Sequence, residues 1–284
     1  MRGHAPAMRS LTHRTGTLEL GGRTLVMGIV NVTPDSFSDG GVHHEPGPAV
    51  VAALRMTLEG ADIVDVGGES SRPGHVVISA DEEWARVQPV LAGLAEAGAS
   101  VPISIDTWKA EMARRALAAG ASIVNDVWGF QRDPAIAEVA AETGAAAILM
   151  HNRDAADASL DIVADILRFL ERSLAIAKTA GVPDDRIVLD PGIGFGKTIE
   201  QSYQAVAALP RLKALGYPVL LGLSRKAFIG RAFQPEAPPM ARLPGTLAAN
   251  TFGVMGGADI VRVHDVKEHV QAMRVLDTLR TAPA

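Results

Sequence analysis

Residues 24–31 read TLVMGIVN, a short run of apolar and β-branched side chains that ends abruptly in the polar Asn31. The same pattern returns seven more times along the chain. The further runs are DIVDVGG at 62–68, PISIDT at 102–107, SIVND at 122–126, AAILMHN at 146–152, RIVLDPG at 186–192, PVLLGLSRK at 218–226 and DIVRVHD at 259–265. Stretches with helical periodicity lie between most of these runs, and strands that alternate with helices form parallel βαβ units. Eight such units predict a single (β/α)8 barrel, the TIM barrel of the α/β class.

Each predicted strand ends in a polar side chain capable of chemistry. In a (β/α)8 barrel the active site lies at the carboxyl ends of the strands. The polar ends of the eight runs are therefore expected to converge on one pocket.

The length and composition agree with one enzymatic domain. A chain of 284 residues suits a barrel of about 250 residues with short extensions. Its net charge of −5 argues against non-specific nucleic-acid binding. The sequence contains no cysteine, which excludes disulfides and thiolate catalysis and is compatible with a reducing compartment. No run approaches the roughly 18 apolar residues of a membrane span, so no membrane association and a cytoplasmic location are expected.

The N-terminal region shows two further features. Residues 1–16 are polar and basic without the apolar core of a secretory signal, which predicts a flexible tail ahead of a catalytic domain at 17–284. Residues 17–26, TLELGGRTLV, place two apolar-polar runs around Gly21 and Gly22, a pattern typical of a β-hairpin. We expect this hairpin to cap the amino-terminal, or bottom, end of the barrel.

The helices are predicted from apolar periodicity and from their capping residues. Ser79 with Glu82 forms a capping-box pattern, and Pro210 is expected to break or kink the helix that contains it. The expected helices cover 48–60, 79–98, 109–120, 133–144, 158–180, 199–216, 244–258 and 266–280.

The segment GIGFGKT at 192–198 superficially resembles a phosphate-binding loop. A P-loop requires glycine where this chain has Pro191, and the dinucleotide fingerprint requires glycine where it has Lys197. A nucleotide-binding site is therefore not predicted here.

The histidines show no metal-ligand spacing. His43 and His44 are adjacent in a loop, where solvation is expected. His269 lies on the last helix, where a surface position is expected.

Residues 65–74, DVGGESSRPG, form a strand that runs into a turn rich in glycine and serine. Backbone N–H groups in such turns bind anions, and Arg72 adds a bidentate cation. An ordinary βα loop is the alternative, but Ser70, Ser71 and Arg72 together favour an anion.

Arg262 and His264 are two residues apart at the end of the last strand, so they share one face of it. A cation and an imidazole at the barrel mouth suit a phosphate, which barrel enzymes often bind near strands 7 and 8. The alternative is a salt bridge to Asp65 or Asp265.

Asp106, Asn125 and Asp190 end strands 3, 4 and 6, and Lys226 follows strand 7. A carboxylate that faces the interior needs a hydrogen-bond donor, and it can accept two parallel N–H bonds from a guanidine-like edge. Helix caps or structural ion pairs are the alternatives for each residue alone, and Lys226 could also form a Schiff base, bind an anion or lie solvated in its loop. The set suits a flat heterocycle rich in amide groups.

Asn31 precedes a loop that carries Asp35 and Asp39. Its side-chain oxygen could bind Mg²⁺, which takes oxygen ligands and retains waters beside substrate phosphates. An Asx-turn is the structural alternative. The residues by themselves thus predict a barrel enzyme for a phosphorylated or pyrophosphorylated substrate with an amide-rich ring.

The chain resembles the dihydropteroate synthase family over roughly residues 17–280. The motifs that carry the resemblance are GIVNVTPDSFSDGG at 28–41, DIVDVGGESSRPG at 62–74, SIDT at 104–107, ND at 125–126, LDPGIGFGK at 189–197, SRK at 224–226 and RVHDV at 262–266. The resemblance implies condensation of 6-hydroxymethyl-7,8-dihydropterin pyrophosphate with 4-aminobenzoate, which yields 7,8-dihydropteroate and pyrophosphate. It also implies a Mg²⁺ cofactor, a homodimer formed through barrel helices, and competition by sulfonamides.

The resemblance further implies roles for individual residues. The implied pterin-binding residues are Asp106, Asn125, Met150, Asp190, Phe195 and Lys226. The implied pyrophosphate-binding residues are Ser71, Arg72, Arg262 and His264, with Asn31 at the metal. The implied 4-aminobenzoate-binding residues are Phe37, Pro73, Phe195 and Ser224. Asp106, Lys226, Arg262 and His264 would form the catalytic group, and Trp128 stands where the family pattern has a small residue.

Two alternatives remain at this point. A pterin-binding barrel that transfers a methyl group from methyltetrahydrofolate to a corrinoid protein would share the pterin pocket. It would have little use for a pyrophosphate site, so Ser71, Arg72, Arg262 and His264 disfavour it. A catalytically silent barrel that serves as a binding partner should have lost Asp106, Lys226 or Arg262, and all three are present.

Overall fold

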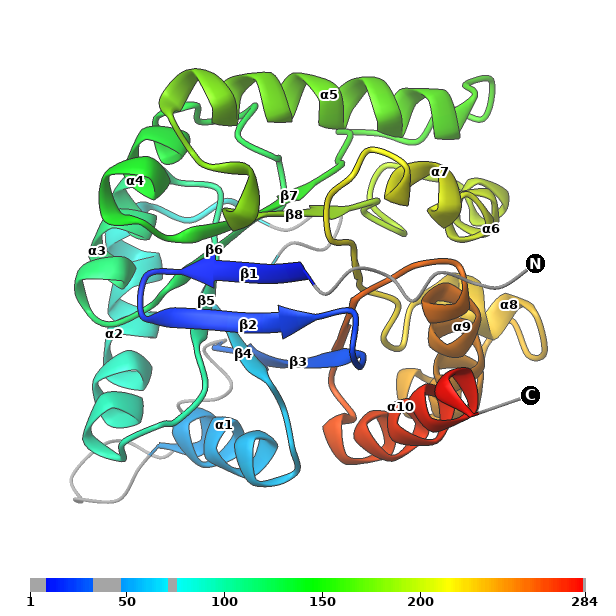
Figure 1. Cartoon of the computed structure of the whole chain (residues 1–284), viewed down its shortest axis with the longest axis horizontal. Helices are drawn as coiled ribbons and strands as arrows, with labels where there is room; N and C mark the ends of the chain where they lie inside the picture. The colour runs from blue at the N-terminus through cyan, green and yellow to red at the C-terminus, as the bar shows by residue number, and fades with distance from the viewer. Residues whose placement is uncertain (1–8, 33–46, 71–75, 283–284) are drawn as a thin grey trace.

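Eight parallel strands form the centre of the molecule, and helices surround them (Figure 1). The computed structural model describes residues 9–32, 47–70 and 76–282. The strands are β3 (Leu25–Asn31), β4 (Ile63–Gly67), β5 (Ile103–Asp106), β6 (Ile123–Asp126), β7 (Ala146–Met150), β8 (Ile187–Asp190), β9 (Leu220–Leu221) and β10 (Ile260–Val263). Their order is β8-β7-β6-β5-β4-β3-β10-β9, and a parallel bridge between Leu189 and Val219 joins the two ends of the sheet. The prediction of a (β/α)8 barrel is confirmed.

The helices follow the strands nearly as the sequence predicts. They are α1 (Pro48–Leu58), α2 (Ala80–Glu96), α3 (Ala110–Ala118), α4 (Ala135–Thr143), α5 (Ile162–Ala180), α6 (Ile199–Ala207), α7 (Leu209–Lys213), α8 (Ala227–Arg231), α9 (Leu243–Met255) and α10 (Val266–Thr281), with short 3-10 turns η2 (Asp184–Arg186) and η3 (Pro239–Arg242). The Ser79 side chain caps α2 by accepting a hydrogen bond from the Glu82 N–H. The chain breaks between α6 and α7 just before Pro210, as predicted. The short α8 was not predicted.

A two-stranded hairpin crosses the bottom of the barrel (Figure 1). It pairs β1 (Arg9–His13) with β2 (Gly16–Leu20), and it turns at residues 14–15. The prediction of a turn at Gly21 and Gly22 is wrong, and the hairpin includes residues assigned to the N-terminal tail. The turn residues Arg14 and Thr15 carry no strong turn signal, whereas Gly21 bends the chain from the hairpin into β3 with a φ of 90°.

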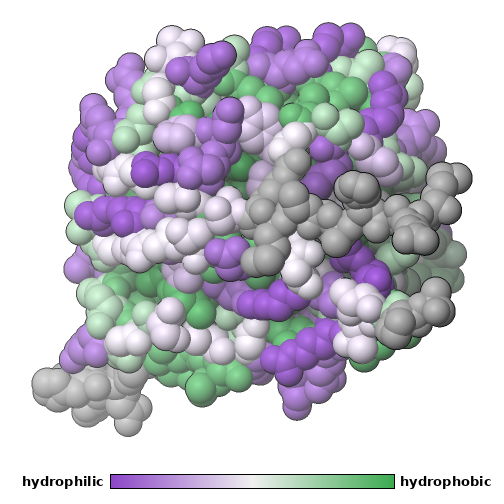
Figure 2. Space-filling model, in the orientation of Figure 1, coloured by the Kyte–Doolittle hydropathy of each residue, from purple (hydrophilic) through white to green (hydrophobic). Residues whose placement is uncertain are grey.

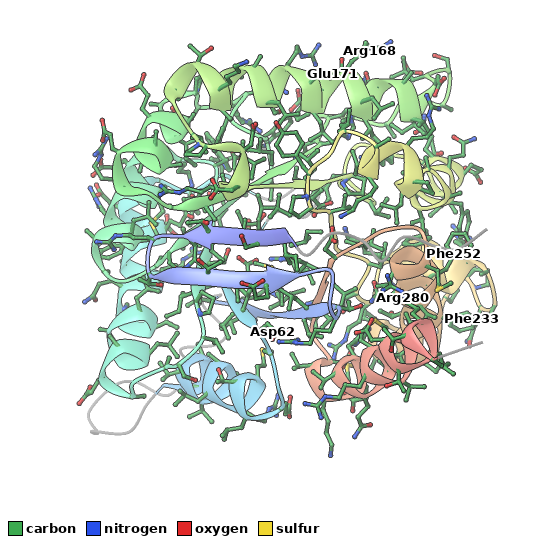
Figure 3. The ribbon with its side chains drawn as sticks, viewed as in Figure 1. Asp62, Arg168, Glu171, Phe233, Phe252 and Arg280 are labelled. Atoms are coloured by element: carbon green, nitrogen blue, oxygen red, sulfur yellow. The ribbon has the colours of Figure 1, made fainter. Side chains whose placement is uncertain are left out.

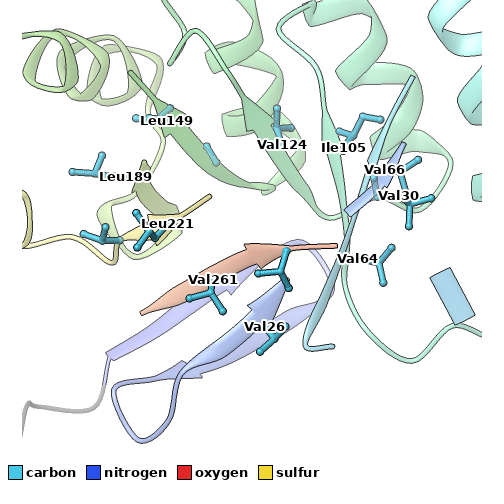
Figure 4. Packing of buried hydrophobic residues seen from close by; sticks show 14 of the residues in the cluster. Val26, Val30, Val64, Val66, Ile105, Val124, Leu149, Leu189, Leu221 and Val261 are labelled. Carbon is cyan, nitrogen blue, oxygen red and sulfur yellow. The ribbon is translucent and has the colours of Figure 1, made fainter. Parts of the chain in front are cut away.

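The strand side chains divide into two apolar sets because successive residues point to opposite faces of a strand. One set faces the helices and includes Val26, Val64, Ile105, Val124, Leu149, Leu189, Leu221 and Val261 (Figure 4). The other set packs with Leu11 and Leu20 of the hairpin and includes Leu25, Met27, Ile63, Ile123, Ile148, Val188, Leu220 and Ile260. The lower half of the barrel interior is therefore a packed apolar core, which the hairpin closes.

His269 is completely buried, so the prediction of a surface position is wrong. It belongs to the stripe of α10 that also buries Val266, Val270 and Met273. Its Nδ1–H donates to the Asp265 carbonyl at 2.7 Å. These residues are spaced by the helical period, so they share the face of α10 that packs on the barrel. The position of His269 on that face buries it, although its imidazole is polar.

On the face that carries the hairpin, the outer surface is neither mainly polar nor mainly apolar. Figure 2 shows hydrophilic and hydrophobic residues interspersed there, with a broad hydrophobic area at α1, where Leu58 is 89% exposed. Within the described residues, no helix combines the length and apolarity needed to cross a membrane.

Candidate active site

The upper half of the barrel interior is polar. Each apolar residue of the inner set is followed, two residues later on the same face, by a residue nearer the carboxyl end of its strand. Ile63 is thus followed by Asp65, Ile123 by Asn125, Ile148 by Met150, Val188 by Asp190 and Ile260 by Arg262. The period of two that builds the core therefore also places these side chains in one layer above it.

Arg262 crosses this layer and joins two carboxylates from other strands. Its Nε donates to Asp65 Oδ2 at 2.6 Å, and its Nη2 donates to Asp106 Oδ2 at 2.7 Å. The Asn125 amide donates to the same oxygen of Asp65 at 3.1 Å. The structure therefore brings together Asp106, Asn125 and Arg262, three of the residues predicted from the sequence.

Asp65 was not predicted as a site residue. It is fully buried, and its Oδ1 has no hydrogen-bond partner among the described residues. The salt bridge to Arg262 that the sequence left as an alternative does form, but it lies inside the site and orients the guanidinium. The spacing of two between Asp65 and the core residue Ile63 is the signal that could have placed this carboxylate on the inner face.

Burial and neighbouring charges shift the pKa values of the ionisable side chains in this layer. Loss of water contact raises the pKa of Asp106 to about 7, and Arg262 opposes this shift while Asp65 adds to it. Burial by itself would lower the pKa of Arg262, but Asp65 and Asp106 outweigh it and raise that pKa. The arginine therefore stays charged, whereas Asp106 titrates near neutrality.

Asp190, at the end of β8, and Lys226, directly before α8, form a second charged group. The Gly192 N–H donates to Asp190 Oδ1 at 2.7 Å. Burial raises the pKa of Asp190, with Lys226 opposing the shift. Burial lowers the pKa of Lys226 to about 8, with Asp190 opposing that shift. Gly222 lies beside Asp190 and Arg262, because a Cβ at this residue would be in ordinary van der Waals contact, 3.9 Å from Asp190 Oδ2 and 4.0 Å from Arg262 Cβ.

Ser224 and His264 are also brought together. Ser224 Oγ accepts a hydrogen bond from the His264 N–H at 3.1 Å and lies 2.8 Å from His264 Nδ1. Arg225, between Ser224 and Lys226, has a φ of 59° and binds Asp265 through both Nε and Nη2. Asp265 therefore pairs with Arg225 and not with Arg262, which leaves the Arg262 guanidinium facing the interior.

A cavity of about 390 Å³ opens beside this layer, above β5 to β8. Asp106 and Phe195 line it and connect it to the charged layer. Its outer wall holds the Arg132 guanidinium between two indoles, 4.8 Å from the Trp108 ring centre and 4.7 Å from that of Trp128. Trp108 and Arg132 were not predicted as part of the site.

Met150 ends β7 on the same inner face and is 4% exposed. Phe37, Ser71, Arg72 and Pro73, as well as the loop histidines His43 and His44, lie outside the described residues.

Asn31 is the last residue of β3 and is exposed at the carboxyl edge of the barrel. Within the described residues, no three histidine, aspartate or glutamate side chains form a metal-binding group. An amide oxygen with open surroundings suits Mg²⁺, which takes few protein ligands and retains waters beside substrate phosphates. The donor chemistry of Asn31 thus fits a magnesium ion shared with an anionic substrate.

Comparison with protein families matches residues 27–264 to the pterin binding enzyme family. Two relatives are each 48% identical to this chain. The dihydropteroate synthase of Clostridium beijerinckii aligns over 92% of this chain and 96% of its own length, and that of Bacillus subtilis over 90% and 89%.

Solved structures of dihydropteroate synthases also resemble this chain. The enzyme from Clostridium difficile, in the presence of pteroic acid, is 46% identical with a TM-score of 0.87 and covers 93% of this chain and 99% of its own. The enzyme from Xanthomonas albilineans with 4-aminobenzoic acid is 43% identical with a TM-score of 0.88, and it covers 94% and 96%. A Yersinia pestis enzyme in complex with a sulfonamide drug is 41% identical with a TM-score of 0.86, and it covers 96% and 100%.

Proposed function

This chain belongs to the pterin-binding enzyme family, and from that premise we propose how its polar barrel layer performs the reaction of a dihydropteroate synthase. The chain condenses 6-hydroxymethyl-7,8-dihydropterin pyrophosphate with 4-aminobenzoate to give 7,8-dihydropteroate and pyrophosphate, a step of folate biosynthesis. The observation that supports the assignment of roles is the layer in which Asp106, Asn125 and Asp190 surround Arg262, with the charge of Lys226 acting on Asp190.

Recognition of the pterin ring rests on Asp190, Asn125 and Lys226. The Asp190 carboxylate accepts from the ring N–H and the 2-amino group, a pairing like that of a carboxylate with a guanidinium. Asn125 completes the contacts to the ring edge, and Lys226 donates to the ring carbonyl. Met150 packs on the ring, and Phe195 forms the opposite wall.

The reaction begins as the C–O bond between the pterin methylene and the pyrophosphate breaks, and the electron pair leaves with the pyrophosphate. Positive charge spreads into the ring, where ionised Asp106 stabilises it. Arg262 and His264, with Ser71 and Arg72, hold the departing anion. Asn31 would hold a magnesium ion, which would supply further neutralisation of the pyrophosphate charge.

The amino group of 4-aminobenzoate then attacks the methylene, forms the C–N bond and releases a proton to solvent. Ser224 and Phe195, together with Phe37 and Pro73, are proposed to hold this substrate. Its aniline nitrogen needs no strong general base, because the carbon it attacks is already cationic. Sulfonamides are expected to compete for this position, as a sulfonamide drug forms a complex with the related Yersinia pestis enzyme.

The function is tested by pyrophosphate release from the purified protein, supplied with Mg²⁺ and the dihydropterin pyrophosphate, with and without 4-aminobenzoate. We expect release that depends on both substrates, with 7,8-dihydropteroate identified by mass. Chelation of the metal is expected to abolish turnover, and added Mg²⁺ to restore it. Tight pterin binding without condensation would instead favour the barrel that handles methyltetrahydrofolate.

The pH profile of kcat/KM for the pterin substrate is expected to be a narrow bell. Its acid limb follows Asp106, whose pKa of about 7 means that the stabilising carboxylate is lost as the pH falls below that value. Its basic limb follows Lys226, whose pKa of about 8 means that the donating ammonium is lost as the pH rises above it. Since kcat/KM reports groups of the free enzyme, each limb should change about tenfold per pH unit.

Lys226→Arg is the control for the basic limb, because arginine keeps its charge throughout this range. This variant should retain the acid limb and lose the basic one. A basic limb that stays in place in Lys226→Arg would contradict the assignment to Lys226.

A homodimer in the cytoplasm is the proposed state of the chain. The adjacent helices α9 and α10 expose large apolar side chains, with Phe252 58%, Met255 64%, Val275 62% and Leu279 70% exposed. Figure 3 labels Phe252 on α9, and Phe233, which follows α8, lies close to Gly245 of the same helix. Exposed apolar side chains gathered on neighbouring helices are typical of a protein interface.

Replacement of Phe252 and Leu279 by aspartate is expected to convert the dimer to a monomer, because charges would then have to be buried in the interface. Sedimentation velocity of both forms measures the change. Leu58→Asp on α1 is the control, since Leu58 is even more exposed but belongs to neither α9 nor α10, and this variant should remain dimeric. A dimer that survives the double replacement would exclude this interface.

A further inference from the structure

The ammonium group of Lys197 lies inside the loop that follows β8 and not on its surface. Its Nζ donates to the Gly192 carbonyl at 2.7 Å, to the Phe195 carbonyl at 3.1 Å and to His151 Nδ1 at 2.7 Å. An ammonium group has three N–H donors, and all three have an acceptor here. Lys197 resembles the lysine of a phosphate-binding loop in sequence, but its ammonium group donates its hydrogen bonds to two backbone carbonyls and a histidine of the protein.

The contact with His151 determines the state of that side chain. Burial, and then the positive charge of Lys197, lower the pKa of His151 to about 3, so the imidazole is neutral at ordinary pH. Since Nδ1 accepts from Lys197, the proton resides on Nε2, which donates to Asp165 Oδ2 at 3.2 Å. Asp165 also accepts from Arg153 Nη1 at 2.9 Å. A chain of hydrogen bonds thus runs from the carboxylate of Asp165 through His151 to Lys197.

The loop has little freedom to rearrange around this chain. A Cβ at Gly192 would lie only 1.8 Å from the His151 carbonyl oxygen, and a Cβ at Gly196 would lie 2.4 Å from Arg153 Cβ. Both glycines have positive φ, 63° and 56°. The loop is therefore pressed against the end of β7 at two points, and Lys197 joins the carbonyl groups between them.

The same loop builds one side of the pterin site. The Gly192 N–H donates to Asp190, and the Ile193 carbonyl accepts from Lys226. The Phe195 ring lies 4.6 Å from Lys226 Nζ, and it lines the cavity. The loop therefore contacts both charged groups that recognise the ring, and Lys197, which also lines the cavity, holds the loop through its carbonyl groups.

We propose that Lys197 is a positioning residue for the pterin substrate, held in place by His151 and Asp165. It sets the position of Phe195, and through the loop it aligns Asp190 and Lys226 without contacting the ring. Loss of the Lys197 ammonium would leave the Phe195 carbonyl without a donor and the Gly192 carbonyl with the Phe195 N–H alone, and it would free the loop to move. This proposal rests on the proposed function of the site, because it concerns the affinity for the pterin.

The test is Lys197→Met, measured with the full chain. We expect the Kd for the dihydropterin pyrophosphate, measured by calorimetry without 4-aminobenzoate, to rise about tenfold or more, a loss of about 1.4 kcal/mol in binding. The KM for this substrate should rise with it, while kcat changes less than about threefold because the reacting atoms are not touched. Lys213→Met is the matched control, since it breaks the partly exposed pair with Asp259, away from the site, and should leave KM unchanged.

Variants of His151 provide a second test of the positioning role, and this test remains available if Lys197→Met does not fold. In His151→Gln one amide can accept from Lys197 and donate to Asp165, so pterin affinity should be close to that of the wild type. His151→Leu can do neither and should raise the Kd. The ¹⁵N resonances of the wild-type imidazole should report the Nε2–H tautomer.

Equal pterin affinity in the wild type and in folded Lys197→Met, or in His151→Gln and His151→Leu, overturns the proposal. The proposed function is tested separately. A wild type that binds the pterin but makes no dihydropteroate would refute the proposed function, while the comparison of pterin affinities between variants would still be valid.

Discussion

Replacement of Arg262 by methionine is expected to reduce kcat/KM about 10³-fold, which corresponds to about 4 kcal/mol of lost transition-state stabilisation. The guanidinium is proposed to hold the departing pyrophosphate, and it also carries the hydrogen bonds to Asp65 and Asp106. The same replacement should lower the free energy of unfolding by about 3 kcal/mol, since breaking a buried ion pair leaves carboxylates without a partner. Steady-state kinetics and denaturant unfolding measure the two effects.

The double variant Arg262→Met with Asp65→Asn separates these two losses. Asp65 is fully buried, so its neutral analogue should recover much of the stability, because no charge is then left unpaired at this residue. Activity should not recover, since the cation is still missing. Near-normal kcat/KM in the single variant would refute the role of Arg262 in catalysis.

Replacement of Asp190 by asparagine is expected to change activity and stability in opposite directions. The new amide would face the pterin N–H groups with an N–H of its own, so kcat/KM should fall about 10³-fold or more, as for a buried site deprived of its hydrogen-bond partner. The oxygen of that amide would still accept from the Gly192 N–H, as the carboxylate does. Stability near pH 7 should stay equal or rise, because burial raises the pKa of Asp190 and so disfavours its ionised form in the folded state. Steady-state kinetics and denaturant unfolding at pH 7 measure both changes.

Asp126→Asn is the matched control for this variant. Asp126 also ends a strand and is fully buried, and burial raises its pKa to about 7. It accepts from the backbone N–H groups of Trp128 and Phe130 and does not belong to the inner layer. Its replacement should alter stability while the KM for the pterin stays unchanged. A comparable loss of pterin affinity in both variants would show that Asp190 acts through the fold and not by contact.

The sequence predicted those site residues whose side chains follow the two-residue period of a strand. Asp106, Asn125, Asp190 and Arg262 end runs that alternate regularly, and all four lie on the inner face as expected. The hairpin was predicted at the wrong residues because residues 14 and 15 turn the chain without a turn signal. The prediction for His269 is wrong because the residue's position in the apolar stripe of α10 outweighs its polarity.

The partners of Asp65 and Lys197 could not be predicted from local sequence. Asp65 is separated from Arg262 by 197 residues, and Lys197 from His151 by 46 residues, so no local pattern could join them. Lys197 even sits in a motif that suggests phosphate binding, whereas its three donors are used within the protein.

The sequence by itself determined the class of fold, the eight strand ends and the types of side chain that meet there, because hydrophobic periodicity states which face each residue occupies. Only the tertiary structure decided which of those side chains pair. Partners across the barrel depend on how the strands are staggered as the sheet closes, and this stagger arises from packing of the whole ring. That is why the sequence could propose Arg262 as an anion-binding residue, while its orientation by Asp65 and Asp106 became visible only in the folded barrel.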